Sequence, residues 1–188
     1  MKHAFIMTVI LAAFGLNPNQ AKAAEHKLYA LLDIGQASVP DICTGVTGGC
    51  STTSIAYRPG IGYQFSPNFG LEAGYLAGII FEANTTNNNY TASGFQFGVI
   101  GSMPMNDKTE IFGKVGFAKI DVELNAPSIN YWSSYSNSNL AFGFGVRFNL
   151  SEKIKLRATY EDFGELKGDS ALPPAKASIV SAGVQFSF

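Results

Sequence analysis

Long stretches in which apolar residues strictly alternate with small or polar ones constrain the fold of this chain more than any other feature. Between residues 140 and 150, every even position holds Leu, Phe or Val, and every odd position holds Ala, Gly, Arg or Asn. Neighbouring side chains of a β-strand point to opposite faces, so such alternation predicts strands. The runs exceed the usual strand of about five or six residues and match the roughly 9–11 residues of a tilted membrane-spanning strand.

Runs of this kind follow one another along the chain, separated by turn-forming residues. We expect eight strands, at 27–37, 54–65, 69–81, 92–103, 109–121, 139–150, 154–164 and 178–188. The connections alternate between short ones (66–68, 104–108 and 151–153) and long polar ones (38–53, 82–91, 122–138 and 165–177). Short turns at one end and long loops at the other are typical of transmembrane barrels. The predicted fold class is therefore all-β, an eight-stranded antiparallel transmembrane β-barrel.

The two faces of the predicted strands differ in bulk. One face carries Phe, Tyr, Leu, Ile and Val, with Ile79 among them, and the other carries mostly Gly, Ala, Ser and single charges. A soluble eight-stranded carrier would turn its bulky face inward. The interior of an eight-stranded barrel has only just enough room for side chains, so aromatic residues from every strand would not fit there. We therefore expect the wide face to meet lipid and the narrow face to line the interior.

Charged residues on the narrow face form a set with interleaved signs. We expect two layers, one at mid-depth and one nearer the short turns, made respectively of Asp33, Arg58, Lys114 and Glu161, and of Glu72, Arg147 and Arg157. Asp33 and Arg58 are the best-placed single pair because they lie on neighbouring strands. Buried charges are tolerated when they are paired. The set is compatible with an interior plugged by ion pairs or with a gate in a narrow polar conduit.

The first residues have the pattern of a secretory signal peptide. A positive start is followed by an apolar run at 4–16 and by the small-x-small sequence Ala21-Lys22-Ala23. We place the signal peptide at 1–23 and the barrel domain at 24–188, with an uncleaved anchor helix as the alternative. Cleavage leaves 11 basic and 14 acidic residues, a formal charge of −3, which gives no basic footprint for nucleic acid.

Two cysteines, Cys43 and Cys50, lie in the segment CTGVTGGC. In an exported protein we expect a disulfide between them. A metal site is the rival interpretation, but it needs two more ligands, and the only histidine after the signal peptide is His26, seventeen residues away. We expect no metal and no cofactor.

Aromatic residues are expected at both membrane interfaces. Phe residues near the short turns and at the chain end would form one girdle. Four aromatic residues fall in the predicted long loops, where they either form the second girdle or contact an external ligand: Tyr90, Tyr131, Trp132 and Tyr135.

Taken together, the segments YALLDIGQA, RPGIGYQFSPNFGLEAGY, EIFGKVGFA and LRATYEDFGEL, followed by the terminal VSAGVQFSF, resemble the small outer-membrane β-barrels of the OmpA-like transmembrane domain and OmpX type, a porin-family group. The resemblance covers the whole mature chain. It implies a bacterial outer-membrane protein with periplasmic termini, surrounded by lipid and lipopolysaccharide, that is inserted by the barrel assembly machinery. It also implies that Val184, Phe186 and Phe188 form the assembly signal and that Lys114 is an interior salt-bridge cation. A peptidoglycan-binding domain and a cell-wall tether are not expected, and we expect a monomer.

Some small outer-membrane barrels modify lipid A, but hydrolysis of that kind normally uses a histidine base. His26 lies at the very start of the first strand with no second histidine, so we expect no enzymatic activity. Two hypotheses remain. The barrel either displays four surface loops in a structural, envelope-integrity or adhesion role, with a possible extracellular ligand, or it is a narrow porin-like diffusion channel for small solutes.

Overall fold

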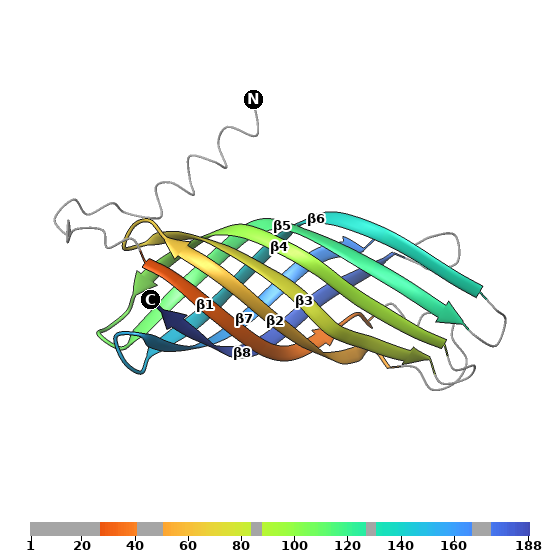
Figure 1. Cartoon of the computed structure of the whole chain (residues 1–188), viewed down its shortest axis with the longest axis horizontal. Helices are drawn as coiled ribbons and strands as arrows, with labels where there is room; N and C mark the ends of the chain where they lie inside the picture. The colour runs from red at the N-terminus through yellow and green to blue at the C-terminus, as the bar shows by residue number, and fades with distance from the viewer. Residues whose placement is uncertain (1–26, 41–50, 84–87, 127–130, 167–173) are drawn as a thin grey trace, which may run out of the picture.

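The computed structural model describes residues 27–40, 51–83, 88–126, 131–166 and 174–188. These residues form eight strands: β1 (Lys27–Ser38), β2 (Thr53–Gln64), β3 (Phe69–Ala83), β4 (Asn88–Pro104), β5 (Thr109–Ala126), β6 (Tyr131–Asn149), β7 (Ile154–Leu166) and β8 (Ala175–Ser187). Each strand is antiparallel to the next, and β1 pairs with β8, so the sheet is a closed barrel (Figure 1). The predicted fold class is confirmed. In the described ranges no helix has the length and apolar character needed to cross a membrane.

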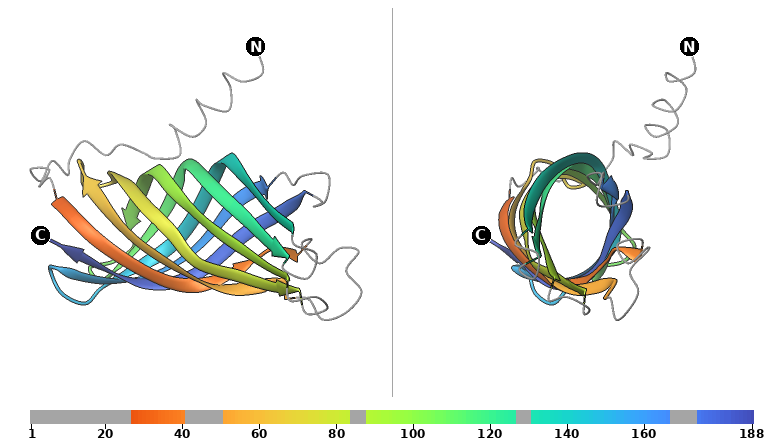
Figure 2. Two further views of the ribbon diagram at one scale, coloured as in Figure 1. Left: turned by 45° about the vertical axis from the view of Figure 1, so that its right-hand side comes forward. Right: turned by 90° about the vertical axis from the view of Figure 1, so that its right-hand side faces the viewer.

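The seam between the first and last strands closes the barrel. Its ladder runs from Tyr29 opposite Ser187 to Ser38 opposite Ser178. Beyond the ladder, the backbone N–H of Phe188 donates to the carbonyl of Leu28 at 3.0 Å. Figure 2 shows the resulting ring when the molecule is viewed along its long axis. Because no sheet edge is left unpaired, the backbone polar groups of the wall are satisfied, as a hydrocarbon environment requires.

The outer surface of the barrel carries the aromatic face, as predicted. Phe95, Phe117 and Phe144 are each about two-thirds exposed, at 65%, 68% and 64%. The charged residues predicted for the inner face point into the interior, where Lys114 on β5 is 6% exposed and Arg147 on β6 is 3% exposed. Apolar side chains that are exposed on every strand fit a lipid environment and would be costly in water.

Three strands are longer than the alternation predicts by five residues or more. β4 already begins at Asn88, β5 continues to Ala126, and the ladder between β5 and β6 extends to the pair Ala126 and Tyr131. The prediction that four aromatic residues lie in long loops is therefore wrong, because Tyr90 is part of β4 and the other three are part of β6, namely Tyr131, Trp132 and Tyr135. Asn and Ser are typical of turns, but here they extend a hairpin whose hydrogen bonds continue beyond the apolar band.

Two glycines with positive φ interrupt the alternation. Gly78 has φ of 77° within a register shift between Leu76 and Ile79. The extra residue reverses which side chains face inward, so Ile79 is 6% exposed while Ile80 is 50% exposed. The prediction that Ile79 faces lipid is therefore wrong. Such β-bulges add one unpaired residue to a strand, and glycine adopts positive φ without steric cost.

The second glycine, Gly164, has φ of 69° in β7, where the register to β8 shifts between Asp162 and Glu165. Phe163 before it and Leu166 after it are both buried. Together the two bulges turn large apolar side chains into the lumen at the end opposite the short turns. We predicted an interior lined mostly by small and charged residues, but the structure also places large apolar side chains there.

Candidate functional site

The mid-depth layer of the interior is organised around the guanidinium of Arg58. Its Nε donates to Asp33 Oδ2 at 3.0 Å, and its Nη1 donates to Gln96 Oε1 at 3.0 Å and to Glu161. Lys114 forms an ion pair with the same Glu161 carboxylate. These residues come from five strands, so one guanidinium and one ammonium tie most of the wall together at this level.

The sequence register explains why this layer forms. Asp33 on β1 lies directly opposite Arg58 on β2 in the ladder, so their side chains meet on the inner face without bending the backbone. Glu161 reaches Arg58 from β7, across the lumen. The amide of Gln96 donates to Glu161 Oε1 at 2.9 Å and accepts from Lys114 at 3.1 Å, so both polar ends of this amide are paired.

The second layer, nearer the short turns, is centred on the carboxylate of Glu72. Arg157 Nη1 donates to Glu72 Oε1 at 2.7 Å, and Arg147 Nη2 lies 3.4 Å from the same oxygen. The hydroxyl of Tyr29 donates to it at 3.0 Å. The ring of Phe112 lies beside both guanidinium groups, with its centroid 4.5 Å from Arg147 Cζ and 5.1 Å from Arg157 Cζ. This is cation–π geometry, which stabilises arginine in a desolvated setting.

Two longer ion pairs connect the layers. Lys114 Nζ lies 3.8 Å from Glu72 Oε2, and Arg157 Nε lies 3.5 Å from Asp33 Oδ1. All seven charged residues singled out from the sequence therefore belong to one network, which we call the ionic plug: Asp33, Arg58, Glu72, Lys114, Arg147, Arg157 and Glu161. Each is 6% exposed or less. A buried charge is held at acceptable cost only when partners surround it, which the plug provides.

Sequence reasoning missed several members of this region. Glu110 and Lys155 form a further pair at 2.6 Å close to the short turns, and Arg147 Nη1 lies 3.8 Å from Glu110. The alternation could have identified both, because Glu110 shares the inner face with Lys114, and Lys155 shares it with Arg157. Gln96 could have been found in the same way, since it alternates with Phe95 and Phe97.

The plug obstructs the lumen. Arg157 on β7 reaches Glu72 on β3, and in a ring of eight strands these two walls are opposite each other. The space beside Arg58, Glu72 and Lys114 has a cavity volume of ≈ 0 Å³. Charged side chains therefore fill the space between these walls in the described part of the barrel.

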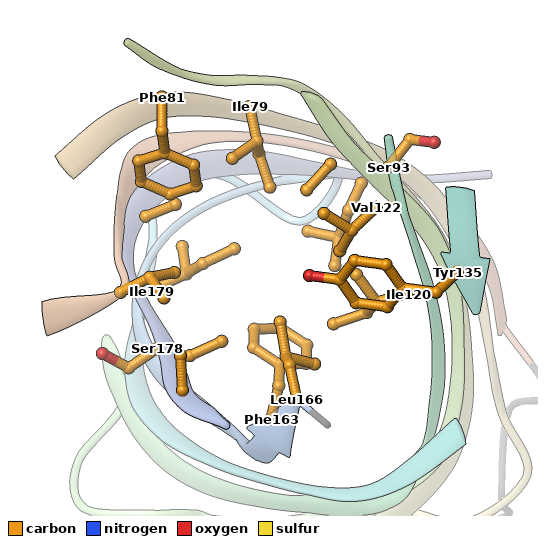
Figure 3. Close-up of a pocket in the computed structure, with 16 residues that line it drawn as sticks. Ile79, Phe81, Ser93, Ile120, Val122, Tyr135, Phe163, Leu166, Ser178 and Ile179 are labelled. Atoms are coloured by element: carbon orange, nitrogen blue, oxygen red, sulfur yellow. The ribbon is translucent and has the colours of Figure 1, made fainter. Parts of the chain in front are cut away.

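An apolar chamber, which we call the cup, occupies the lumen on the other side of the plug. It is lined by Ala37, Val39, Leu76, Ile79, Phe81, Ala92, Ser93, Ile120, Val122, Tyr135, Phe163, Leu166, Ala175, Ala177, Ser178 and Ile179. Figure 3 shows Ile79 and Phe81 on one wall and Phe163 and Leu166 on the facing wall. The cup contains no charged residue among its lining side chains, so the interior changes from ionic to apolar within a few residues.

Comparison with known proteins identifies the chain at the level of a family. A family model described as the outer membrane protein beta-barrel domain matches residues 7–188. The chain belongs to this family. Membership assigns the barrel to a bacterial outer membrane. No curated protein sequence matches the chain.

Several solved structures are similar to this barrel at low sequence identity. Ail, the attachment invasion locus protein of Yersinia pestis, has a TM-score of 0.61 at 17% identity, with 87% of this chain and 99% of Ail covered. Neisserial surface protein A has a TM-score of 0.65 at 13% identity, with coverage of 86% and 97%. OprG from Pseudomonas aeruginosa has a TM-score of 0.60 at 11% identity, with coverage of 88% and 98%. At these identities the similarity shows the fold alone.

The remaining residues predicted from the sequence are distributed as follows. Val184, Phe186 and Phe188 are exposed on the outer face of the family barrel, and the rings of the two phenylalanines meet edge to face at 5.4 Å. Cys43, Cys50 and the segment 1–23 lie outside the described residues, so the disulfide and the signal peptide stay predictions. Tyr135 is partly buried against the cup. The described ranges contain no cluster of residues that could hold a metal ion.

Proposed function

We propose that this protein is a plugged outer-membrane barrel that serves as a surface scaffold, holding four loops outside the cell in a structural, envelope-integrity or adhesion role. The observation that supports this most strongly is the ionic plug, in which Arg157 on β7 and Glu72 on β3 join opposite walls at 2.7 Å. A lumen closed in this way leaves the rim as the part of the molecule available for interaction. In this proposal the barrel is a monomer, lies among outer-membrane lipid and lipopolysaccharide, and has periplasmic termini.

Conductance in planar lipid bilayers tests whether the lumen is closed. We expect no discrete open level for the purified full-length barrel. The double variant Arg58→Ala, Glu161→Ala, which removes the two groups that bridge β2 and β7, should produce small openings and serves as the control for detection. Reproducible openings of the unmodified protein would instead favour the narrow diffusion channel.

Trypsin treatment of intact cells tests the orientation. Lys167 lies in the loop between β7 and β8, whereas Lys108 and Lys153 lie in short turns at the other end. We expect cleavage after Lys167 in whole cells and protection of both turn lysines until the outer membrane is opened. Cleavage at the turn lysines in whole cells would reverse the proposed orientation.

The charge of the loops limits the kind of ligand they can bind. The predicted loop segments 38–53, 82–91, 122–138 and 165–177 contain two lysines and five acidic residues. Ail has been solved with the heparin analogue sucrose octasulfate, but a net negative rim repels such a polyanion. We therefore propose a neutral or basic surface partner for this chain.

Replacing the tips of the loops with Gly-Ser linkers should abolish binding of cells that display the barrel to a host-cell layer, without reducing the amount of folded barrel. Unchanged binding would contradict an adhesion role.

The proposal includes assembly by the outer-membrane insertion machinery through the last strand. Phe188 closes the seam by its hydrogen bond to Leu28, and its side chain is 70% exposed on the outer face. Deleting Phe188 should strongly reduce the folded, heat-modifiable form in cells, whereas Phe95→Ala on the same outer face should not. Equal amounts of folded barrel in both variants would contradict the signal.

The proposal includes no catalytic step, because the chain after residue 23 offers a single histidine, His26. Mass spectrometry of lipid A from cells with and without the protein checks this point. An altered acyl pattern that depends on the protein would show that the barrel is an enzyme.

A further inference from the structure

We propose that the cup is a binding site for the end of an alkyl chain, held between the ionic plug and the loop end of the barrel. This inference does not depend on the surface-scaffold role. It rests on three observations: the chemistry of the lining, the size of the chamber, and the two β-bulges that turn apolar side chains into it.

The lining selects against polar ligands. Apart from Ser93, Ser178 and Tyr135, every lining side chain is hydrocarbon. In Figure 3 the hydroxyls of Ser93 and Ser178 point away from the chamber. Of the three polar lining side chains, Tyr135 alone directs its ring and hydroxyl into it. A sugar or an ion that entered would lose its water without gaining matching hydrogen bonds, at a cost of several kcal/mol. An apolar group would instead gain by leaving water.

The size of the chamber restricts how much of a ligand it can take. The cavity volume is ≈ 50 Å³. A water-sized group needs about 10–15 Å³ on this measure, so the cup has room for about four such groups. This fits the last few carbons of one alkyl chain and excludes a whole lipid. The ligand must therefore leave its polar end beyond the rim.

The two β-bulges add three large side chains to the cup, whose other apolar residues face inward by simple alternation. Without the extra residue at Gly78, strict alternation would direct Ile79 and Phe81 to the lipid face, but both are buried in the lumen at 6% and 3% exposure. The bulge at Gly164 has the same effect on Leu166. The bulges lie on β3 and β7, which are opposite each other in the ring, so they turn apolar side chains toward one another across the lumen.

The floor of the cup is the ionic plug, which makes the chamber a dead end. Phe163 in the lining follows Glu161 of the plug by two residues on the inner face of β7, and Leu76 follows Glu72 by four on β3. The region beside the plug has no free volume. A chain end that enters from the loop side is therefore held and not conducted.

The occupant is a single-chain amphiphile with an alkyl tail, and it could come from either of two sources. It could be a free fatty-acid-like molecule from the medium, or it could be an acyl chain of a membrane lipid that reaches over the rim. The chemistry recognised is the same, so the experiment is designed to distinguish them.

The test uses the full-length barrel in phospholipid nanodiscs, with isoleucine δ1 methyl groups labelled for NMR. Ile79, Ile120 and Ile179 line the cup, and Ile34 and Ile61, exposed at 51% and 60% on the outer face, report any general partitioning into lipid. Titration with butanoate, hexanoate and octanoate should shift the cup methyls saturably and leave the outer methyls unchanged. Affinity should rise about fourfold per methylene and then level off after about four buried carbons.

Protonated and perdeuterated lipid distinguish the sources. If a bilayer acyl chain fills the cup, the cup methyls show nuclear Overhauser contacts to lipid chain protons, which vanish in deuterated lipid, and added carboxylates compete with it. Saturable shifts without such contacts assign the site to a free amphiphile. Neither saturable shifts nor lipid contacts at the cup methyls would overturn the proposal and leave the cup as ordinary core packing.

Matched variants locate the effect. Ala92→Leu places three more carbons in the cup, whereas Ala182→Leu makes the same change on the lipid face. The first should weaken octanoate binding at least tenfold and the second should leave it unchanged. If Ala92→Leu does not fold, Phe81→Ala provides the opposite change, and the chain length at which affinity levels off should then increase by several carbons. If neither variant changes the octanoate affinity or the chain length at which affinity levels off, the proposed site is wrong.

Discussion

The half of the lumen near the short turns and the half near the loops carry opposite chemistry on the same eight strands. In the turn half, Glu72, Arg147 and Arg157 are held by directional contacts. In the loop half, Phe81 and Phe163 pack without any charged neighbour in the lining. The outer face carries exposed apolar residues beside both halves, such as Phe148 near the turns and Ile80 near the loops, so the difference lies in the inward residues.

This contrast shows that an eight-stranded interior can be closed in two ways. Ion pairs hold specific strands in register because each donor has one best acceptor, but they are costly if a partner is missing. Apolar packing tolerates small vacancies, and the vacancy here is the cup. The two halves should therefore respond very differently to substitution.

The largest effect is expected from Glu72→Ala. This change leaves Arg147, Arg157 and Lys114 without their shared carboxylate in a buried setting. Loss of one partner of a buried ionic group typically costs about 3–5 kcal/mol of unfolding free energy. Urea unfolding of the barrel in lipid vesicles, followed by the heat-modifiable band on gels, measures it. Glu165→Ala, an exposed acid near the rim, is the control and should change stability by less than about 0.5 kcal/mol. Equal effects would remove the distinction between plug and rim.

A smaller effect is expected from truncating the cup. Ile120→Ala should cost about 2 kcal/mol, at the low end for buried isoleucine because the side chain already borders a cavity. Ile61→Ala on the lipid face should cost less, because acyl chains fill the space that is left. The same unfolding assay applies to both. A larger loss for Ile61→Ala would mean that the cup contributes nothing to stability.

The two bulge glycines should differ from each other. An alanine Cβ at Gly78 would lie 2.7 Å from Tyr57 Cδ2, whereas at Gly164 the nearest atom is the carbonyl oxygen of Leu140 at 3.8 Å. Both variants pay the left-handed backbone cost of about 1–2 kcal/mol, and Gly78→Ala adds a clash. Gly78→Ala should thus destabilise more, and it should also shift the NMR signal of the Ile79 methyl. An equal loss for both would show that Tyr57 moves aside freely.

The smallest effect is expected at the turn end. Lys155 and Glu110 are partly exposed, with side-chain exposures of 17% and 18%. Lys155→Ala should cost no more than about 1 kcal/mol, and the difference should shrink as salt increases. The effect of Glu72→Ala should be insensitive to salt, since its partners are shielded from solvent. Unfolding at low and high NaCl compares them, and a salt-sensitive Glu72→Ala would indicate that water reaches the plug.

Much of this architecture could be predicted from alternation alone. The number of strands, their antiparallel order and the outward aromatic face all follow from period two and from the limited room inside. The pairing of Asp33 with Arg58 could be anticipated because both occupy the narrow face at equal distances from the long loop that joins their strands. The structure places them directly opposite each other.

The side chains that the bulges add to the cup could not be predicted, and the reason is local. Gly78 fits the narrow-face pattern of Gly70 and Gly74, so nothing in its identity reveals that its φ is positive. A single unpaired residue moves every later side chain of the strand to the opposite face of the sheet. Glycine is common on the narrow face, so a bulge glycine is hidden among its neighbours. The length of β6 was missed for a different reason, since Ser and Asn are typical of turns and here occupy a strand.

The unequal lengths of the strands have a consequence for which insertions and deletions the sequence can accept during evolution. β5 and β6, with 18 and 19 residues, extend farther than the other strands at the loop end (Figure 1). Because their pairing is regular to Ala126 and Tyr131, residues gained or lost at this hairpin in pairs, one for each strand, keep the inward and outward sides of both strands. The hairpin can therefore become longer or shorter at its loop end without disturbing the plug, the cup or the seam.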